Sequence, residues 1–205
     1  ALVTRGTARR TGPELDAAIE FVGGSLEAGA GRDPLNLSLR MLRKDLGLGL
    51  DLLAEVVLSP AFPPAEVARK IPEIQAAIKR SDEDPGTVAG RALGRLVYPG
   101  HPYGVPVEGT QESVGRLTRD DVVAFHRAHV RPDTTVIAVV GAVTVADARR
   151  EIVARFGAWP RPAEATPRMT AAAPGPGPRE EAITRADLTQ STIMFGRQAV
   201  RQTHP

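Results

Sequence analysis

The stretch PPAEVARKIPEIQAAIKRSDEDP, residues 63–85, organises the rest of the chain. Its apolar residues recur at spacings of four, three and four, and they are Val67, Ile71, Ile74 and Ile78. That spacing predicts one apolar face of an amphipathic α-helix packed against a core. Pro64 is typical of a helix start, and the SDEDP sequence ends the helix at Pro85. Pro72 lies inside the pattern and lacks a backbone donor, so we expect a kink there.

Two neighbouring segments alternate between apolar and polar residues, which is typical of β-strands. They are residues 25–31 and 35–42, and the turn sequence GRDP lies between them. The pattern predicts an antiparallel hairpin. The run TTVIAVV, residues 134–140, is rich in β-branched residues and predicts a buried central strand. A further strand is expected at Gln190–Phe195.

Helix start signals mark the other predicted helices. Thr118 is followed three residues later by Asp121, which is the spacing of a capping box. Thr144 occupies the corresponding capping position before the next apolar pattern. The expected helices cover residues 12–22, 45–58, 87–97, 118–130 and 145–156.

The composition is that of an ordinary globular domain. Of 205 residues, 42% are hydrophobic and 24% are charged, and the formal net charge is only +2. Because the basic residues are spread along the chain, we expect neither a nucleic-acid surface nor a membrane-binding patch. No run approaches the length of about 18 apolar residues that a membrane span needs. The chain has no cysteine, which fits the cytoplasm or the periplasm, and we place the periplasm first.

Four motifs together resemble the pitrilysin/insulinase (M16) family of zinc peptidases. They are LSPAF at 58–62, HPYG-x-P-x-x-GT at 101–110, LTRDDVVAFH at 117–126 and the RPD–strand–VVGAVT segment at 131–144. The resemblance extends from residue 1 to about residue 160. It implies an α+β fold, with an antiparallel-rich sheet and helices packed on one face, as in an M16 half-domain.

The resemblance also implies where zinc ligands would lie. In the family, two histidines of an inverted H-x-x-E-H motif and a glutamate on a later helix bind zinc. That glutamate position corresponds to Ala77, and a second acidic position corresponds to Lys70. A methyl group and a cation supply no anionic ligand, and the sequence contains no H-x-x-E-H. We therefore expect no catalytic residue and no metal in this chain, with zinc held by an active partner.

Three segments are expected along the chain. Residues 1–160 would form an M16-like N-terminal half-domain, and residues 161–180 form a linker rich in proline, alanine and glycine. Residues 181–205 would supply a connector and the first strand of a truncated second half-domain. The opening sequence ALVTRGT resembles the middle of a helix-to-loop transition, so we interpret the chain as a fragment.

Other candidate residues have two interpretations each. His101 and Tyr103 lie in a loop rich in glycine and proline, which forms either a substrate or partner surface or a rigid connector. Glu73 belongs to the same possible surface. His126 and His129 are three residues apart and could share a helix face as metal ligands, or they could end a scaffold helix whose dipole favours cations.

Three functions remain open at this point. The first is a non-catalytic subunit of a bacterial M16 peptidase, paired with a zinc-bearing chain or second half-domain to bind and degrade peptides. The second is a catalytic M16 peptidase whose H-x-x-E-H precedes residue 1, with Glu73 as a replacement ligand. The third is a structural protein without activity, similar to the respiratory-complex core subunits of this fold.

Overall fold

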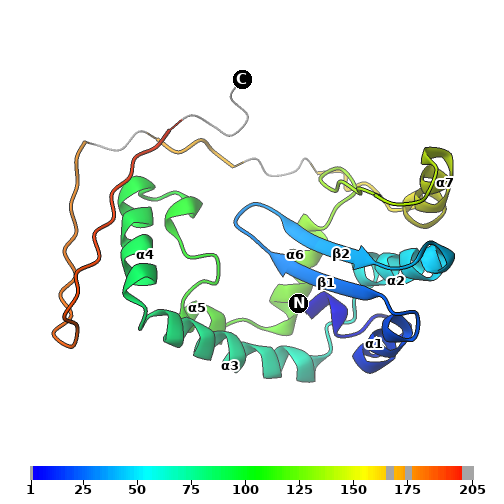
Figure 1. The fold of residues 1–205 in the computed structure, drawn as a ribbon, viewed down its shortest axis with the longest axis horizontal. Coiled ribbons are helices and arrows are strands. Elements are labelled where there is room, and N and C mark those ends of the chain that lie inside the picture. Colours follow the sequence, from blue (N-terminus) through cyan, green and yellow to red (C-terminus); the bar gives the residue numbers. More distant parts are fainter. Residues whose placement is uncertain (1, 165–168, 174–176, 200–205) are drawn as a thin grey trace. The chain divides into compact units, whose positions relative to one another are not determined.

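The computed structural model describes residues 2–164, 169–173 and 177–199 (Figure 1). The elements in order are η1 (Leu2–Thr4), α1 (Gly12–Phe21), β1 (Ser25–Ala30), β2 (Leu35–Arg40), η2 (Arg43–Asp45), α2 (Leu46–Leu58), α3 (Pro64–Ser81), α4 (Pro85–Val97), η3 (Pro102–Gly104), α5 (Gln111–Gly115), α6 (Arg119–His129) and α7 (Val145–Phe156). They form two compact units, Ala1–Lys70 with Leu117–Pro167, and Ile71–Arg116 with Arg168–Pro205. Each unit is described by itself.

The core of the first unit lies between a two-stranded sheet and two helices. β1 and β2 pair antiparallel, with Leu26 opposite Leu39 and Ala28 opposite Leu37. Because side chains alternate along a strand, these four residues share one face of the sheet. The buried side chains that this face packs against come from α1 and α2, and they are Leu15, Ile19, Leu52 and Val56. The predicted hairpin is confirmed, and its apolar face explains its position.

The helix starts follow the predicted capping residues. The Thr118 hydroxyl accepts a hydrogen bond from the Asp121 amide at 3.2 Å, and the Asp121 carboxylate accepts one from the Thr118 amide at 2.8 Å. The Thr118 hydroxyl also donates to the Asp121 carboxylate at 2.6 Å, and this bond together with the one from the Thr118 amide lowers the pKa of Asp121. Thr144 accepts from the Asp147 amide at 3.1 Å and begins α7. The helix expected at residues 45–58 is α2, which begins at Leu46, and the Asp45 side chain before it makes no capping hydrogen bond.

The helix predicted from the central stretch is α3. Val67 and Ile78 on its apolar stripe are buried, with exposed fractions of 5% and 3%. The helix continues through Pro72. The boundary between the two units falls within α3, between Lys70 and Ile71. The amphipathic pattern therefore identified the helix that belongs to both units.

Two predicted strands are wrong as elements of this structure. Residues 134–140 and 190–195 are not β-strands, and several of their apolar side chains are exposed, including Val136 at 92% and Val140 at 98%. A β-strand needs a neighbouring strand to hydrogen-bond with. Within the described residues the sheet holds only β1 and β2, so neither segment has a ladder to join.

The fold class is α+β, as expected for an M16 half-domain: a small antiparallel sheet carries helices on one face. The division into residues 1–160, 161–180 and 181–205 stays a prediction. Parts of its linker and of its last segment, residues 165–168, 174–176 and 200–205, lie outside the described residues. Within the described part of the chain, no helix has the length and apolarity needed to cross a bilayer.

Candidate functional site

Lys70 and Ala77, where the resemblance places the family's acids, lie on α3 with Glu73. Lys70 is half-buried, whereas Glu73 and Ala77 are exposed. An ammonium group and a methyl group offer no anionic donor, so these two positions do not fit a zinc ion. Across residues 2–164, 169–173 and 177–199, no group of three or more histidine, cysteine, aspartate or glutamate side chains has an arrangement that could hold a metal.

The loop that contains His101 and Tyr103 is organised by aromatic contacts and one turn. The His101 Nδ1 atom accepts a hydrogen bond from the Tyr103 amide at 3.1 Å, so Nε2 carries the proton and donates to the Thr170 carbonyl at 3.0 Å. The rings of Tyr98, His101 and Tyr103 contact one another with centroid distances between 5.1 and 5.9 Å. These contacts give His101 a structural role in its loop. Its role in a substrate or partner surface stays a prediction.

The two histidines of α6 have separate environments. The His126 Nε2 atom lies 3.0 Å from the Val57 carbonyl oxygen, at the last turn of α2. The ring also packs edge-on against Phe62, with centroids 5.5 Å apart. Burial lowers the pKa of His126 and favours the neutral ring. His129 instead lies against Phe125, at 4.5 Å between ring centroids. The bond to Val57 occupies the Nε2 atom of His126 and leaves Nδ1 as the ring nitrogen that could bind a metal.

Arg119 fixes the segment that leads into α3. Its Nε atom donates to the Phe62 carbonyl at 2.9 Å, and its Nη2 atom donates to the Ala61 carbonyl at 3.0 Å. Phe62 has a φ of +46°, a left-handed conformation that non-glycine residues rarely adopt. Its ring is nonetheless almost fully buried. Packing and the two hydrogen bonds therefore hold a strained residue two positions before the start of α3.

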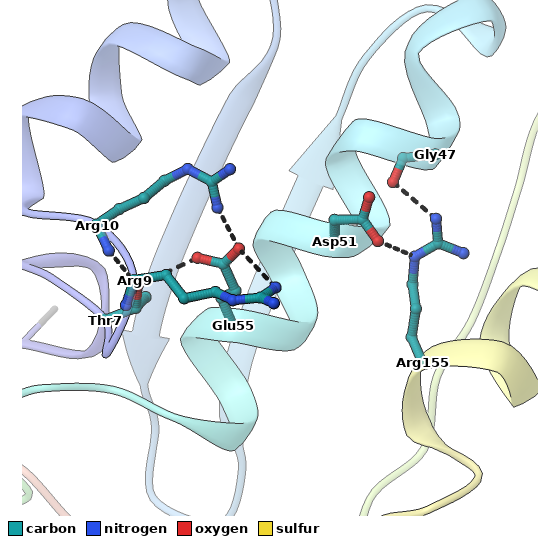
Figure 2. Close-up of polar contacts among 7 residues, drawn as sticks. All are labelled: Thr7, Arg9, Arg10, Gly47, Asp51, Glu55 and Arg155. Atoms are coloured by element: carbon teal, nitrogen blue, oxygen red, sulfur yellow. Dashed lines mark hydrogen bonds and ion pairs between the residues drawn. The ribbon is translucent and has the colours of Figure 1, made fainter.

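Sequence reasoning missed a buried carboxylate on α2. Glu55 has an exposed fraction of 8%, and Figure 2 shows its carboxylate facing Thr7, Arg9 and Arg10. The Thr7 hydroxyl donates to Oε2 at 3.1 Å, Arg10 pairs with Oε1, and an Arg9 guanidinium nitrogen lies 3.8 Å from Oε1. The same Thr7 oxygen accepts from the Arg10 amide at 3.0 Å. Glu55 thereby ties the loop before α1 to α2.

A second ionic contact ties α7 to α2. Arg155 donates from Nε to the Asp51 carboxylate at 2.6 Å and from Nη2 to the Gly47 carbonyl at 3.0 Å (Figure 2). Asp51 and Glu55 are four residues apart, so both carboxylates extend from neighbouring turns of α2. Nothing in the sequence linked Glu55 to residue 10 or Asp51 to residue 155. The unusual position of an acid within an apolar helix was the only available signal.

Two family models match the sequence, and both describe domains of M16 peptidases. Residues 1–111 match the family described as insulinase, peptidase family M16, and residues 116–205 match the family described as peptidase M16 inactive domain. An uncharacterized zinc protease of Mycobacterium leprae is 33% identical over 142 residues, which is 69% of this chain and 32% of that protein. Subunit 1 of the mouse mitochondrial cytochrome b-c1 complex is 28% identical over 142 residues, 69% of this chain and 30% of that protein.

The fold agrees with a solved structure of the same group. The crystal structure of a peptidase M16 inactive domain from Pseudomonas fluorescens superposes with a TM-score of 0.79 and 27% sequence identity. The match covers 85% of this chain and 42% of that one. This chain thus spans less than half the length of these relatives. Because the insulinase family matches more than half of the sequence, the chain belongs to peptidase family M16.

Proposed function

We propose that this chain is the non-catalytic part of an M16 zinc-peptidase assembly. In this account it pairs with a chain or half-domain that carries an intact H-x-x-E-H motif. The zinc ion and the hydrolytic chemistry belong to that partner. This chain contributes wall and contact surface for the peptide that the pair binds and degrades.

The observation that carries the proposal is the pair of residues on α3. Lys70 and Ala77 replace the acids that the family resemblance places at these two positions. Seven residues make nearly two helical turns, so the two positions belong to the same helix face. A chain that bound zinc here would need a carboxylate at position 77 to complete its ligand set. The match of residues 116–205 to the inactive domain of the family supports the same conclusion.

One observation favours a structural role as the second candidate. Subunit 1 of a mitochondrial cytochrome b-c1 complex is among the relatives of this chain, at 28% identity. A structural role and a non-catalytic role differ in whether an active partner exists. The catalytic alternative requires an upstream H-x-x-E-H and a replacement ligand such as Glu73.

Co-purification tests the pairing. The full-length protein is expressed with an affinity tag, together with an M16 chain from the same organism that carries H-x-x-E-H, and light scattering measures the mass of the complex. We expect a stable complex that contains both chains. Recovery of the tagged protein without the second chain, combined with peptide cleavage by the tagged protein alone, would contradict the proposal.

A further inference from the structure

The apolar face of α4 is covered by an extended segment from the end of the chain. Residues 190–198 run beside α4 in the second unit (Figure 1). Met194 lies over Gly90: a Cβ atom added to Gly90 would be 3.7 Å from the Met194 Sδ atom. Gly196 lies against Leu93: a Cβ atom added to Gly196 would be 3.3 Å from the Leu93 Cδ2 atom.

Every second residue between positions 194 and 198 contacts α4. Gln198 donates to the Val97 carbonyl at 2.8 Å, which adds a third contact beyond those at positions 194 and 196. Alternate residues of the extended segment thus meet α4 at positions 90, 93 and 97, which lie on one helix face. The residues between them face away, since Ile193 and Phe195 are 85% and 93% exposed. The segment has the side-chain alternation of a β-strand although it forms no ladder.

Residues 179–181, which come earlier in the chain, also contact the last turn of α4. Arg179 donates to the Leu96 carbonyl at 2.6 Å, and Glu181 pairs with Arg95 at 2.8 Å. The carbonyls of Leu96 and Val97 belong to the last turn of α4, where no intrahelical donor reaches them. A cavity of about 1130 Å³ lies between α4 and these two stretches. Within the described residues 177–199, neither stretch is a β-strand, so their backbones form no sheet with each other.

We propose that this face of α4 is a binding site for an extended peptide, and that residues 190–198 occupy it as an intramolecular ligand. The site takes an apolar side chain over Gly90, a small residue against Leu93 and an amide or guanidinium donor at the Val97 carbonyl. The chain's own segment, already seated there in extended form, identifies the chemistry of the occupant. The inference deepens the proposed function, on which it rests for the expectation that the chain handles peptides.

The absence of cysteine from the sequence allows a clean test. Leu93→Cys combined with Gly196→Cys places two thiols at the contact, and oxidation locks residues 190–198 onto α4. The probe is a fluorescent peptide with the sequence of residues 188–199, LTQSTIMFGRQA. Its binding is measured by fluorescence anisotropy to the oxidised and the reduced forms of the same variant, with no partner chain present.

We expect binding to the reduced form and no binding to the oxidised form. Gln198→Ala in an otherwise unchanged chain weakens the intramolecular contact and raises the apparent affinity of the probe about fivefold. Phe195→Ala is the matched control, because Phe195 faces away from α4 and its loss leaves the affinity unchanged. A probe that carries the Met194→Ala change binds more weakly than one that carries Phe195→Ala.

Three results would overturn the inference. They are equal binding to the oxidised and reduced forms, no binding to any form, and covalent dimers upon oxidation, which would assign the α4 face to a second copy of the chain. Because the assay uses no partner chain, its failure is distinct from a failure of the proposed pairing. The pairing is measured by co-purification.

Discussion

Arg119, the first residue of α6, donates from its Nε atom to the carbonyl oxygen of Phe62 at 2.9 Å. Phe62 is buried and has a positive φ, and α3 begins two residues later. The guanidinium therefore stabilises a backbone conformation that would otherwise relax toward the extended region. This contact fixes the start of the helix that carries positions 70 and 77.

Replacing Arg119 with alanine should destabilise the first unit. The carbonyls of Ala61 and Phe62 each lose a charged donor, and we expect the free energy of unfolding to fall by about 1–3 kcal/mol. Urea denaturation measures the change. Arg116→Ala is the matched control, since among the described residues Arg116 pairs only with the exposed Glu112, at 3.4 Å, and its loss should change stability by less than about 0.5 kcal/mol. Equal effects of the two substitutions would contradict a role for Arg119 at Phe62.

Glu55 should matter more than its neighbour Asp51. Replacement of Glu55 by alanine removes the acceptor of Thr7 and Arg10 from a buried position, and we expect a loss of about 1.5–3 kcal/mol in the free energy of unfolding. Asp51→Ala removes a carboxylate that is 55% exposed and should cost less than about 1 kcal/mol. Thermal unfolding of both variants compares them. A smaller effect at Glu55 than at Asp51 would show that the buried contact does not stabilise the fold.

His126 should make stability depend on pH. Burial lowers its pKa in the folded state below the value of about 6.5 that the unfolded chain has. The unfolded state then binds the proton more readily, so stability is fully present above about pH 6.5 and falls as the pH drops through the folded pKa. His126→Gln, which keeps a donor for the Val57 carbonyl, should flatten this dependence.

Urea midpoints between about pH 7.5 and 5.5 measure the effect of His126 as a difference between variants. The contradicting result is a wild-type protein and a His126→Gln variant that lose stability in parallel as the pH falls. That outcome would mean that other titrating groups determine the whole pH dependence.

Adding one carboxylate at position 77 of α3 should not create a zinc site. Ala77→Glu adds a single carboxylate to an exposed position, whereas zinc in proteins is held by at least three protein ligands. We therefore expect no change in zinc affinity for this chain, measured by competition with a fluorescent chelator. A large gain in zinc affinity from this one substitution would mean that two further ligands already lie within reach.

The sequence predicted features that depend on residues close together in the chain, and it did not predict contacts between distant residues. Local patterns predicted the hairpin and the helix starts, because Thr118 and Thr144 bind groups three residues away. The strand predicted at residues 134–140 depended on a neighbouring strand, and β-branched composition alone supplies no hydrogen-bonding partner. The pairs between Arg10 and Glu55 and between Arg155 and Asp51 join residues 45 and 104 apart, and no local pattern encodes them.

For the candidate site, the sequence identified the family, whereas the assignment of Lys70 and Ala77 to the positions of the family's acids stays a prediction and the contacts around these residues were not predicted. His101 and His126 were found as histidines, whereas their hydrogen bonds to Thr170 and Val57 depend on segments 69 residues away. The register between residues 194–198 and α4 likewise required coordinates. The strand expected at 190–195 was wrong, because these residues are extended without the hydrogen bonds of a ladder.

The zinc content of the full-length protein tests the central claim most directly. It is measured by mass spectrometry of the metal, for the protein purified alone and for its complex with an M16 chain that carries H-x-x-E-H, together with cleavage of a quenched fluorescent peptide. The account predicts zinc and cleavage only in the complex, at about one zinc ion per pair. Stoichiometric zinc and peptide cleavage in the protein alone would contradict it and would direct the search for a replacement ligand to Glu73.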